Sequence, residues 1–241
     1  MIDFTGKCAI VTGASIGIGR ATAEKFAELN CNLALVSRDY DKLIELKEKL
    51  EKKVDVLIFK CDVSDEDAVK KVVAETIEHF GKVDILVNNA GIWRRWIPFA
   101  ETESSMWKQY IDVNILGTLY FTHAVLQNML ANHYGKIINV ASVAGVYGNA
   151  LQVDYSMTKG ALISFTKALA KEVTDKGVFV NAVSPGSVSN KQDEPEPTEL
   201  SFTGRTGTHT ENANLIAFLA SDEASYIAGQ NIQVDGCRKK M

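Results

Sequence analysis

The chain contains few cysteines and few prolines, and it has no long apolar run. Its 241 residues include four cysteines and four prolines, with 46% hydrophobic and 23% charged residues. The sequence lacks a stretch of about 18 consecutive apolar residues, which argues against a membrane-spanning helix. The segment Met1–Thr5 has neither the basic nor the apolar part of a secretory signal. We therefore expect a soluble, cytoplasmic protein that folds as one domain over residues 1–241.

The cysteines and histidines show no spacing that is typical of a metal site or a disulfide framework. Three of the cysteines, Cys8, Cys31 and Cys61, lie at the ends of apolar runs. This placement indicates small core residues in a reducing compartment. We expect no metal, because the four histidines also lack ligand spacing. The net charge of -4 argues against a general nucleic-acid binder.

Short apolar runs alternate with amphipathic segments, a pattern typical of a parallel sheet with crossover helices. We expect a Rossmann-like α/β fold, doubly wound, with a predominantly parallel seven-stranded sheet, helices on both faces and a ligand across the carboxyl ends of the strands. The expected strands are residues 8–12, 32–36, 54–60, 83–87, 136–141, 178–183 and 231–234. The expected helices are residues 17–29, 40–52, 66–80, 104–132, 153–176 and 210–221.

A glycine-rich turn follows the first expected strand. Gly13, Gly17 and Gly19 have the spacing Gly-x-x-x-Gly-x-Gly and lead into a helix. Glycines allow a tight turn and close backbone approach, and free N–H groups at a helix start favour a pyrophosphate. The spacing differs from the Gly-x-Gly-x-x-Gly dinucleotide fingerprint, so the turn alone is also compatible with a simple chain reversal.

Tyr155 and Lys159 are the pair that most directly suggests a reaction. They are four residues apart in an expected helix, so their side chains lie on one face. A tyrosine ionises near pH 10, and use of its phenolate near neutrality needs a shift of roughly two to three pKa units. A neighbouring ammonium has the right sign to lower the pKa. Taken alone, such a pair is more often an ordinary tyrosine and lysine on one helix surface.

Together these motifs resemble the short-chain dehydrogenase/reductase family, in its classical subgroup. The resemblance covers the chain from about Lys7 to Gly236 and implies an oxidoreductase that interconverts a ketone and a secondary alcohol by hydride transfer with a nicotinamide cofactor. The matching motifs are Thr12-Gly13-Ala14-Ser15-Ile16-Gly17-Ile18-Gly19, Asn88-Asn89-Ala90-Gly91, Asn114, Ser142, Tyr155, Lys159 and Pro185-Gly186.

The resemblance assigns catalytic roles to four residues. It implies that Tyr155 is the general acid and base and that Ser142 hydrogen-bonds the same substrate oxygen. Lys159 is expected to favour the phenolate and to bind the nicotinamide ribose hydroxyls. Asn114 is expected to support a water that links Lys159 to solvent.

Cofactor choice is expected to depend on Ser37 and Arg38 at the end of the second strand. An acidic residue at position 37 would repel a 2′-phosphate, whereas Arg38 can bind that phosphate through charge-assisted hydrogen bonds. We therefore expect NADP(H) to be preferred, with NAD(H) as the alternative. Two features oppose this expectation: Ile16 stands where NADP-preferring relatives often carry a basic group, and Asp39 can partly neutralise Arg38.

The other expected cofactor contacts follow the ends of later strands. Asp62 is expected beside the adenine, and Asn88 is favoured over Asn89 as a contact beneath the cofactor. The complete set of expected contacts is Gly13, Ser15, Ile16, Gly17, Ile18, Gly19, Ser37, Arg38, Cys61, Asp62, Val63, Asn88, Ala90, Gly91, Tyr155, Lys159, Pro185, Gly186 and Val188.

Three segments are expected to shape the substrate site. The aromatic and guanidinium groups of Ile92–Trp96 are suited to bind a substrate with an apolar body and an anionic tail. They are equally suited to cover the helix that follows or to form a subunit contact. Val143–Leu151 is expected to line another wall. Lys191–Pro197 departs from the family pattern, because two prolines and several acids disfavour the usual closing helix. We expect a mobile or partly open lid there.

The motifs leave the substrate open between a 3-oxoacyl thioester, a hydroxysteroid, and a sugar or polyol. A catalytically silent NADP-sensing protein is the alternative function. The resemblance also implies a homotetramer or homodimer, paired through the helices expected at 104–132 and 153–176. Apolar residues such as Leu162, Phe165 and Leu169 fit such pairing and an ordinary core equally well. We expect a small-molecule partner, and neither nucleic acid nor membrane.

Overall fold

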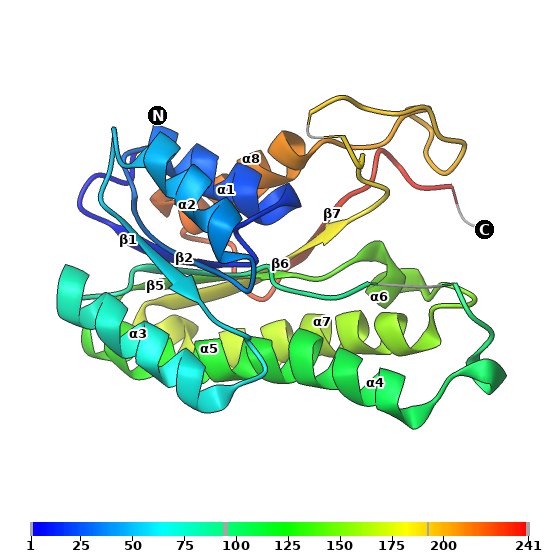
Figure 1. The fold of residues 1–241 in the computed structure, drawn as a ribbon, viewed down its shortest axis with the longest axis horizontal. Coiled ribbons are helices and arrows are strands. Elements are labelled where there is room, and N and C mark those ends of the chain that lie inside the picture. The colour runs from blue at the N-terminus through cyan, green and yellow to red at the C-terminus, as the bar shows by residue number, and fades with distance from the viewer. Residues whose placement is uncertain (1, 94–95, 192, 240–241) are drawn as a thin grey trace.

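The computed structural model describes residues 2–93, 96–191 and 193–239. Within them, seven parallel strands form a sheet in the order β3-β2-β1-β4-β5-β6-β7 (Figure 1). This order confirms the expected doubly wound sheet, because it reverses direction between β1 and β4. The strands are β1 (Cys8–Thr12), β2 (Asn32–Ser37), β3 (Val56–Lys60), β4 (Ile85–Asn88), β5 (Gly135–Val140), β6 (Val178–Pro185) and β7 (Asn231–Val234).

Helices cover both faces of the sheet (Figure 1). One face carries α1 (Gly17–Glu28), α2 (Tyr40–Leu50) and α8 (His209–Ala220). The other carries α3 (Glu66–Phe80), α5 (Gly117–Ala131) and α7 (Val153–Val173). The shorter elements are η1 (Phe99–Glu101), α4 (Ser104–Tyr110), η2 (Ile111–Leu116), α6 (Val143–Tyr147), η3 (Thr174–Lys176) and η4 (Asp222–Ala224).

The core forms two apolar layers, one on each face of the sheet. Val11 and Leu33 pack with α1 and α8 on one side, whereas Ile10 and Ala34 pack with α3 and α5 on the other. Successive side chains of a strand point to opposite faces, so a strand covered on both sides must be apolar throughout. This is why β1 is buried at all five positions.

The continuous helix expected over residues 104–132 is divided in the structure. α4 is followed by η2, a π-helical segment, before α5 begins at Gly117. A Cβ added to Gly117 would lie 2.6 Å from Val63 Cγ2, so this helix packs very closely against the loop after β3. Local π-helical turns are common at functional sites, and this one carries Asn114. The helix α6, between Ser142 and the turn at Gly148, is a second element that the sequence pattern did not predict.

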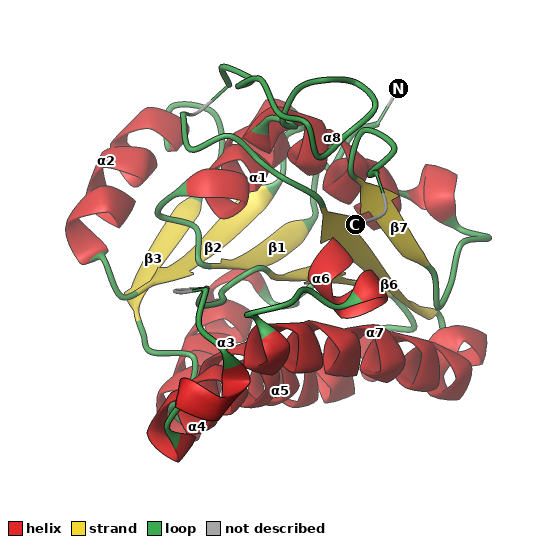
Figure 2. Cartoon of the chain, turned by 90° about the vertical axis from the view of Figure 1, so that its right-hand side faces the viewer, coloured by secondary structure: helices red, strands yellow, loops and turns green. Residues whose placement is uncertain are grey.

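The carboxyl ends of the strands open toward one side of the molecule. Figure 2 views that side, with α6 and the loop before α8 lying above the sheet ends. Within the described residues, no helix is both long and apolar enough to span a membrane.

Candidate active site

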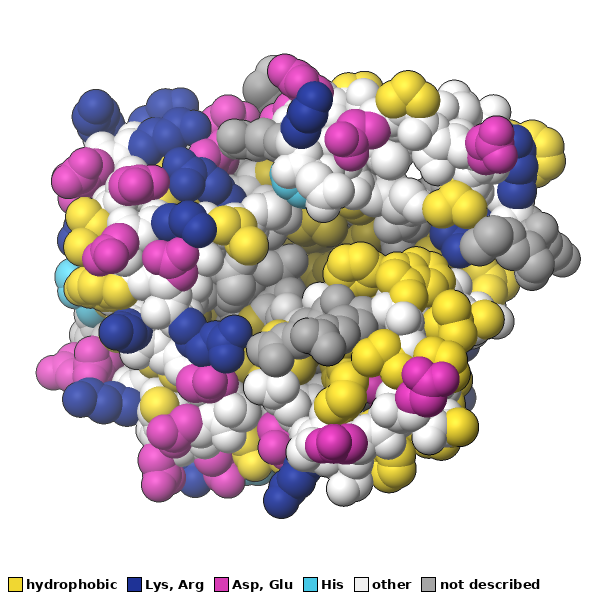
Figure 3. Space-filling model, turned by 45° about the vertical axis from the view of Figure 1, so that its right-hand side comes forward, with side chains coloured by type: hydrophobic (Ala, Val, Ile, Leu, Met, Phe, Trp, Pro, Cys, Tyr) yellow, Lys and Arg dark blue, Asp and Glu magenta, His cyan; other side chains and the backbone are white. Residues whose placement is uncertain are grey.

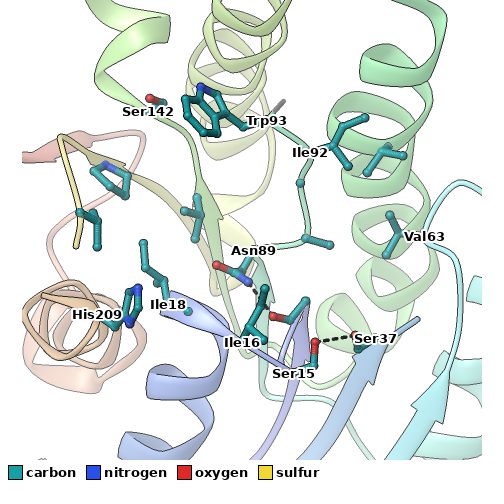
Figure 4. Close-up of a pocket in the computed structure, with 18 of the residues that line it drawn as sticks. Ser15, Ile16, Ile18, Ser37, Val63, Asn89, Ile92, Trp93, Ser142 and His209 are labelled. Carbon is teal, nitrogen blue, oxygen red and sulfur yellow. Dashed lines mark hydrogen bonds between the residues drawn. The ribbon is translucent and has the colours of Figure 1, made fainter. Parts of the chain in front are cut away.

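A cavity of about 550 Å³ runs along the carboxyl ends of the strands (Figure 4). It reaches from Ser37 and Arg38 at one end to Ser142 and Tyr155 at the other. Most of the residues expected from the sequence contribute to its wall. These are Gly13, Ser15, Ile16, Gly17, Ile18, Ser37, Arg38, Cys61, Asp62, Val63, Ala90, Gly91, Ser142, Tyr155, Lys159, Pro185, Gly186 and Val188.

The start of α1 offers an anion site in the middle of this cavity. Ile16 occupies the N-cap position but makes no side-chain cap, and the first turn contains no acidic residue. Gly17 has a φ of 61°, a conformation that glycine adopts without strain. The first N–H groups of a helix have no intrahelical acceptors and carry the positive end of its dipole. An uncapped helix start that lines a cavity therefore fits a pyrophosphate.

Gly19 has a different role from the expected one. It lies behind the turn and does not line the cavity, and a methyl group there would overlap the Gly13 carbonyl oxygen and the Asn89 amide. Asn89 Nδ2 donates to Thr12 O at 2.9 Å and to Gly13 O at 3.2 Å. Gly19 therefore sets the shape of the turn by allowing α1 to approach it closely.

The structure also reverses the expected roles of Asn88 and Asn89. Asn88 is buried and points away from the cavity, where its Nδ2 donates to Thr122 Oγ1 and Asn139 Oδ1, both at 3.0 Å. Asn89 lines the cavity. Successive side chains leave a strand on opposite faces, so only one of the two neighbours can face the ligand.

Ser37, Arg38 and Asp62, which were expected at the adenosine of a dinucleotide, line one end of the cavity. Ser37 Oγ donates to Ser15 Oγ at 2.8 Å, which ties β2 to the glycine turn. Arg38 Nη1 lies 3.6 Å from Asp62 Oδ2, and both side chains are about half exposed. Burial opposes the ionisation of Asp62, but hydrogen bonds from Ser64 and the charge of Arg38 together lower its pKa.

Asp39 does not pair with Arg38, contrary to one expectation from the sequence. It caps α2 by accepting from Lys42 N at 3.3 Å, and its carboxylate lies 3.0 Å from Lys42 Nζ. The acidic group that pairs with Arg38 is Asp62, which follows the neighbouring strand β3.

At the opposite end, α7 presents Tyr155 and Lys159 from successive turns. Lys159 is buried, its Nζ donates to Val140 O at 2.8 Å, and it lies 5.8 Å from the centroid of the Tyr155 ring. Burial lowers the pKa of Lys159 to about 8, because desolvation penalises the ammonium. Gly91 makes this approach possible, since a Cβ there would lie 3.3 Å from Lys159 Nζ.

The pKa of Tyr155 is shifted in the direction opposite to the one expected from the sequence. Burial raises it and is the largest cause, while a hydrogen bond with Ser142 acts to lower it. The charge of Lys159 is not among the causes of this shift, and its Nζ donates to the Val140 carbonyl oxygen. Tyr155 is therefore a protonated phenol at neutral pH in this structure.

Ser142 is placed beside Tyr155 by the close crossing of α6 and α7. It follows β5 and caps α6, with its Oγ accepting from Ala144 N at 3.1 Å. A Cβ added to Gly145 would lie 2.6 Å from Gly160 N, so only glycine permits this approach of the two helices. The crossing brings Ser142 and Tyr155 together from two segments of the chain.

Asn114 is fully buried behind the cavity wall. Its Oδ1 accepts from Ile92 N at 2.8 Å, and its Nδ2 donates to Ile92 O and Thr158 Oγ1, both at 3.1 Å. Its side chain thus links the loop after β4 to α7, the helix that carries Tyr155. Its support of a water at Lys159 stays a prediction.

His209 lines the cavity, although no role was expected for it from the sequence. It is the first residue of α8, and its ring points into the cavity (Figure 4). A Cβ added to Gly17 would lie 3.8 Å from His209 Nε2. Periodicity and spacing carry no signal for this residue, because only the packing of α8 against α1 brings it to the glycine turn.

The segment between Gly186 and α8 contains no helix among its described residues, 187–191 and 193–208. It is tied to α8 at two points. Asp193 accepts from Thr210 N at 3.1 Å, and Arg205 Nη2 pairs with Glu211 Oε1 at 2.6 Å. The pKa of Glu211 falls to about 2 because of its hydrogen bonds, first among them the one from Arg205. The expected mobility of this lid stays a prediction.

The loop after β4 lies at the substrate end of the cavity. Ile92 is buried, whereas Trp93 and Trp96 are about half exposed. Arg94 and Arg95, which were expected to hold an anionic tail, lie outside the described residues. No group of three or more His, Cys, Asp or Glu that suits a metal ion occurs within the part of the chain that the structure describes.

Comparison with known proteins identifies the family of the chain. The family model described as short chain dehydrogenase matches residues 7–199. The chain belongs to this family. It is therefore an oxidoreductase that acts on CH–OH or C=O groups, and the family uses NAD(P)(H).

Several curated members of the short-chain dehydrogenase family align along almost the whole chain. The 3-oxoacyl-(acyl-carrier-protein) reductase FabG of Thermotoga maritima is 38% identical over 241 residues, which cover 96% of this chain and 97% of that protein. The protein of the same name from Staphylococcus aureus strain Mu50 is 39% identical, with 95% and 97% covered. That from Aquifex aeolicus is 36% identical, with 98% of both chains covered.

A solved structure shares the fold. The crystal structure of NAD+-bound xylitol dehydrogenase superposes with a TM-score of 0.89 at 30% identity, covering 97% of this chain and 99% of that one.

Proposed function

We propose that the chain is an NADP(H)-dependent ketone reductase, with residues 1–241 acting as one cofactor-binding and catalytic domain. The observation that carries this proposal is the convergence of Ser142, Tyr155 and Lys159 at one end of a cavity. The other end of the same cavity carries Arg38, and the uncapped start of α1 lies between the two ends. An elongated dinucleotide bound along it would present its nicotinamide to the tyrosine.

The cofactor supplies the hydride when bound, and the protein handles the proton. We infer that Ser142 and Tyr155 hydrogen-bond the substrate carbonyl oxygen, and that Tyr155 transfers its proton there as negative charge develops. The raised pKa of Tyr155 keeps the phenol protonated at neutral pH. This state suits reduction of a ketone, whereas oxidation of an alcohol requires the phenolate as a base.

Lys159 is proposed to act through its charge and position. With a pKa of about 8, it is mostly an ammonium at neutral pH. Its Nζ lies 5.8 Å from the centroid of the Tyr155 ring, and we propose that its charge favours the phenolate as the proton leaves, although it does not offset the effect of burial on the pKa of the resting phenol. We also propose that it binds the nicotinamide ribose hydroxyls, for which Gly91 leaves space.

The preference for the 2′-phosphorylated cofactor rests on Arg38. Its guanidinium is about half exposed at the cavity end and can donate to a phosphate. Asp62 opposes this preference because it shares the same guanidinium. The xylitol dehydrogenase structure holds NAD+, so both cofactors need to be compared in one assay.

The first substrate class to test is a 3-oxoacyl thioester, because the curated relatives named above are 3-oxoacyl-(acyl-carrier-protein) reductases. A polyol or sugar is the second candidate, favoured by the likeness to xylitol dehydrogenase. NADPH oxidation measured with acetoacetyl thioesters, and NADP+ reduction measured with xylitol, would separate the two classes.

The decisive experiment on the mechanism is Tyr155→Phe. This variant keeps the ring and removes the proton donor, so turnover should fall at least about 1000-fold while NADPH still binds. Fluorescence titration of NADPH is the control. Activity close to that of the parent protein would refute the proposed role of Tyr155.

We further propose a cytoplasmic homo-oligomer, a tetramer or a dimer, paired through α5 and α7. Tyr120, Ile163 and Phe165 on these helices are only partly buried within one chain. Light scattering on the purified protein measures the assembly directly. A monomer at micromolar concentration would refute this part of the proposal.

A further inference from the structure

A second cavity lies beside the catalytic one, and the proposed mechanism makes no use of it. It has a volume of about 430 Å³ and is lined by Trp96, Tyr147, the turn 148–150, Arg238 and Lys239. Trp96 and Tyr147 are 54% and 51% exposed. Figure 3 shows hydrophobic side chains gathered along one rim of the central hollow. Large exposed apolar patches often mark binding or interaction sites.

The C-terminal segment brings two cations to this cavity on a fixed backbone. Lys239 N donates to Leu200 O at 2.9 Å, and Phe202 N donates to Cys237 O at 3.0 Å. Arg238 lies between these two hydrogen bonds and forms an isolated antiparallel bridge with Ser201. Both side chains are thus presented from a backbone that is already ordered, which reduces the entropy lost when they bind a ligand.

Neither cation is neutralised within the described part of the chain. Arg238 Nη2 makes a long hydrogen bond to Asn149 Oδ1, at 3.4 Å, and Lys239 Nζ lies 5.5 Å from the centroid of the Phe202 ring. Neither contact supplies a negative charge. Two cations without a carboxylate partner, next to two aromatic rings, form a site with an apolar wall and a positive end.

Two segments connect this second cavity with the catalytic cavity. Helix α6 begins after Ser142, in the catalytic wall, and ends at Tyr147, in the wall of the second cavity. The five-residue step corresponds to about 7.5 Å along the helix axis. The loop after β4 likewise contributes Trp93 to the first cavity and Trp96 to the second. Two segments thus contribute to the walls of both cavities.

We propose that the second cavity binds an anionic group of the substrate, a carboxylate or a phosphate, while the ketone of the same molecule reacts at Tyr155. This inference rests on the proposed reductase function and names its substrate class. Trp96 and Tyr147 contact the apolar stem, and Arg238 and Lys239 bind the anion. The substrate is an amphipathic, anionic ketone whose charge is separated from the reacting carbonyl by an apolar stem comparable in length with α6, whose rise is about 7.5 Å.

The test compares substrates that differ only in charge. The carboxylate arm uses 5-oxohexanoate, 7-oxooctanoate and 9-oxodecanoate, each against its methyl ester. The phosphate arm uses acetoacetyl-4′-phosphopantetheine against acetoacetyl-pantetheine, which lacks only the phosphate. In at least one arm, kcat/KM for the anionic member should exceed that of its neutral partner about tenfold, through a lower KM. The oxo acids should show this only in the longer members.

The matched variants remove charge and retain side-chain length. In Arg238→Gln with Lys239→Gln, the ratio of anionic to neutral kcat/KM should fall about tenfold, and in the parent protein 0.5 M salt should lower the same ratio. Lys171→Gln removes an exposed charge from α7, away from the second cavity, and should leave the ratio unchanged. Circular dichroism establishes that each variant is folded.

The outcomes separate this inference from the function on which it rests. If no substrate, neutral or charged, is reduced with NADPH, the proposed function fails. If neutral ketones are reduced but neither arm shows a preference for the anion, or if the double variant keeps the preference, the second cavity is not an anion subsite. A Trp96→Ala variant that dissociates the oligomer without altering the ratio would assign this surface to a subunit contact instead.

Discussion

The buried ammonium of Lys159 makes a prediction about stability that does not depend on knowing the substrate. Its pKa is about 8 in the folded chain against an ordinary 10.5, and burial is the cause. Between pH 8 and pH 10.5, Lys159 is protonated in the unfolded chain and neutral in the folded chain. Because the unfolded state then binds more protons, the free energy of unfolding rises with pH across this window. Below pH 8 both states are charged, and this contribution is lost.

The magnitude follows from the same two pKa values. Raising the pH from 7 to 10 should add about 2.5 kcal/mol to the free energy of unfolding through Lys159 alone. Other groups also titrate in this range, so the quantity to measure is the difference between the parent protein and Lys159→Met. Methionine has a similar length and no charge. Loss of the hydrogen bond to Val140 O shifts that difference by a constant and leaves its pH dependence intact.

The assay is urea unfolding of both proteins at pH 7, 8, 9 and 10, followed by circular dichroism. Relative to Lys159→Met, the parent protein should gain roughly 2 to 3 kcal/mol over this range, which corresponds to roughly 5–10 °C in melting temperature. Turnover should be lost in the variant at every pH. Parallel stability curves would show that Lys159 keeps an ordinary pKa, and the reasoning from its burial would then be wrong.

Three further predictions concern the cofactor cavity. Gly19→Ala should lower the free energy of unfolding by roughly 1–3 kcal/mol and weaken NADPH binding, because the added methyl overlaps the glycine turn and the Asn89 amide. Thermal denaturation measures the first effect, and an unchanged melting temperature would contradict it. Arg38→Ala should lower kcat/KM for NADPH about tenfold more than kcat/KM for NADH, because the guanidinium binds the 2′-phosphate. Asp62→Asn should shift the preference toward NADPH. If Arg38→Ala affects both cofactors equally, Arg38 does not bind the phosphate. His209→Ala should weaken the binding of both cofactors several-fold in fluorescence titrations. His209→Gln keeps a hydrogen-bond donor and should retain most of the affinity. Unchanged affinity in both variants would mean that the imidazole does not contact the cofactor.

The sequence by itself was sufficient for the framework of the protein. All seven strands occur at or within two residues of their expected positions, because each is an apolar run that must be covered on both faces. The glycine turn and the pair Tyr155 and Lys159 were identifiable for a similar reason. Their function depends on spacing within one turn or one helix, which the chain carries locally.

Contacts between distant segments needed the tertiary structure. Which of Asn88 and Asn89 faces the ligand depends on the face of β4 that the sheet presents. The position of His209 depends on the packing of α8 against α1. The cations of the second cavity depend on the C-terminal segment crossing to the end of α6. No local pattern specifies such contacts.

The direction of the Tyr155 pKa shift shows this division most clearly. The spacing to Lys159 gave the right neighbour but the wrong sign, because a helix pattern reports which side chains are close and does not report how far they are from water. Burial of the phenol and the bond from Lys159 to the Val140 carbonyl arise only when β5, α6 and α7 come together. The sequence thus determined the chemical groups of the site, and the packing of these elements determined the directions in which their pKa values shift.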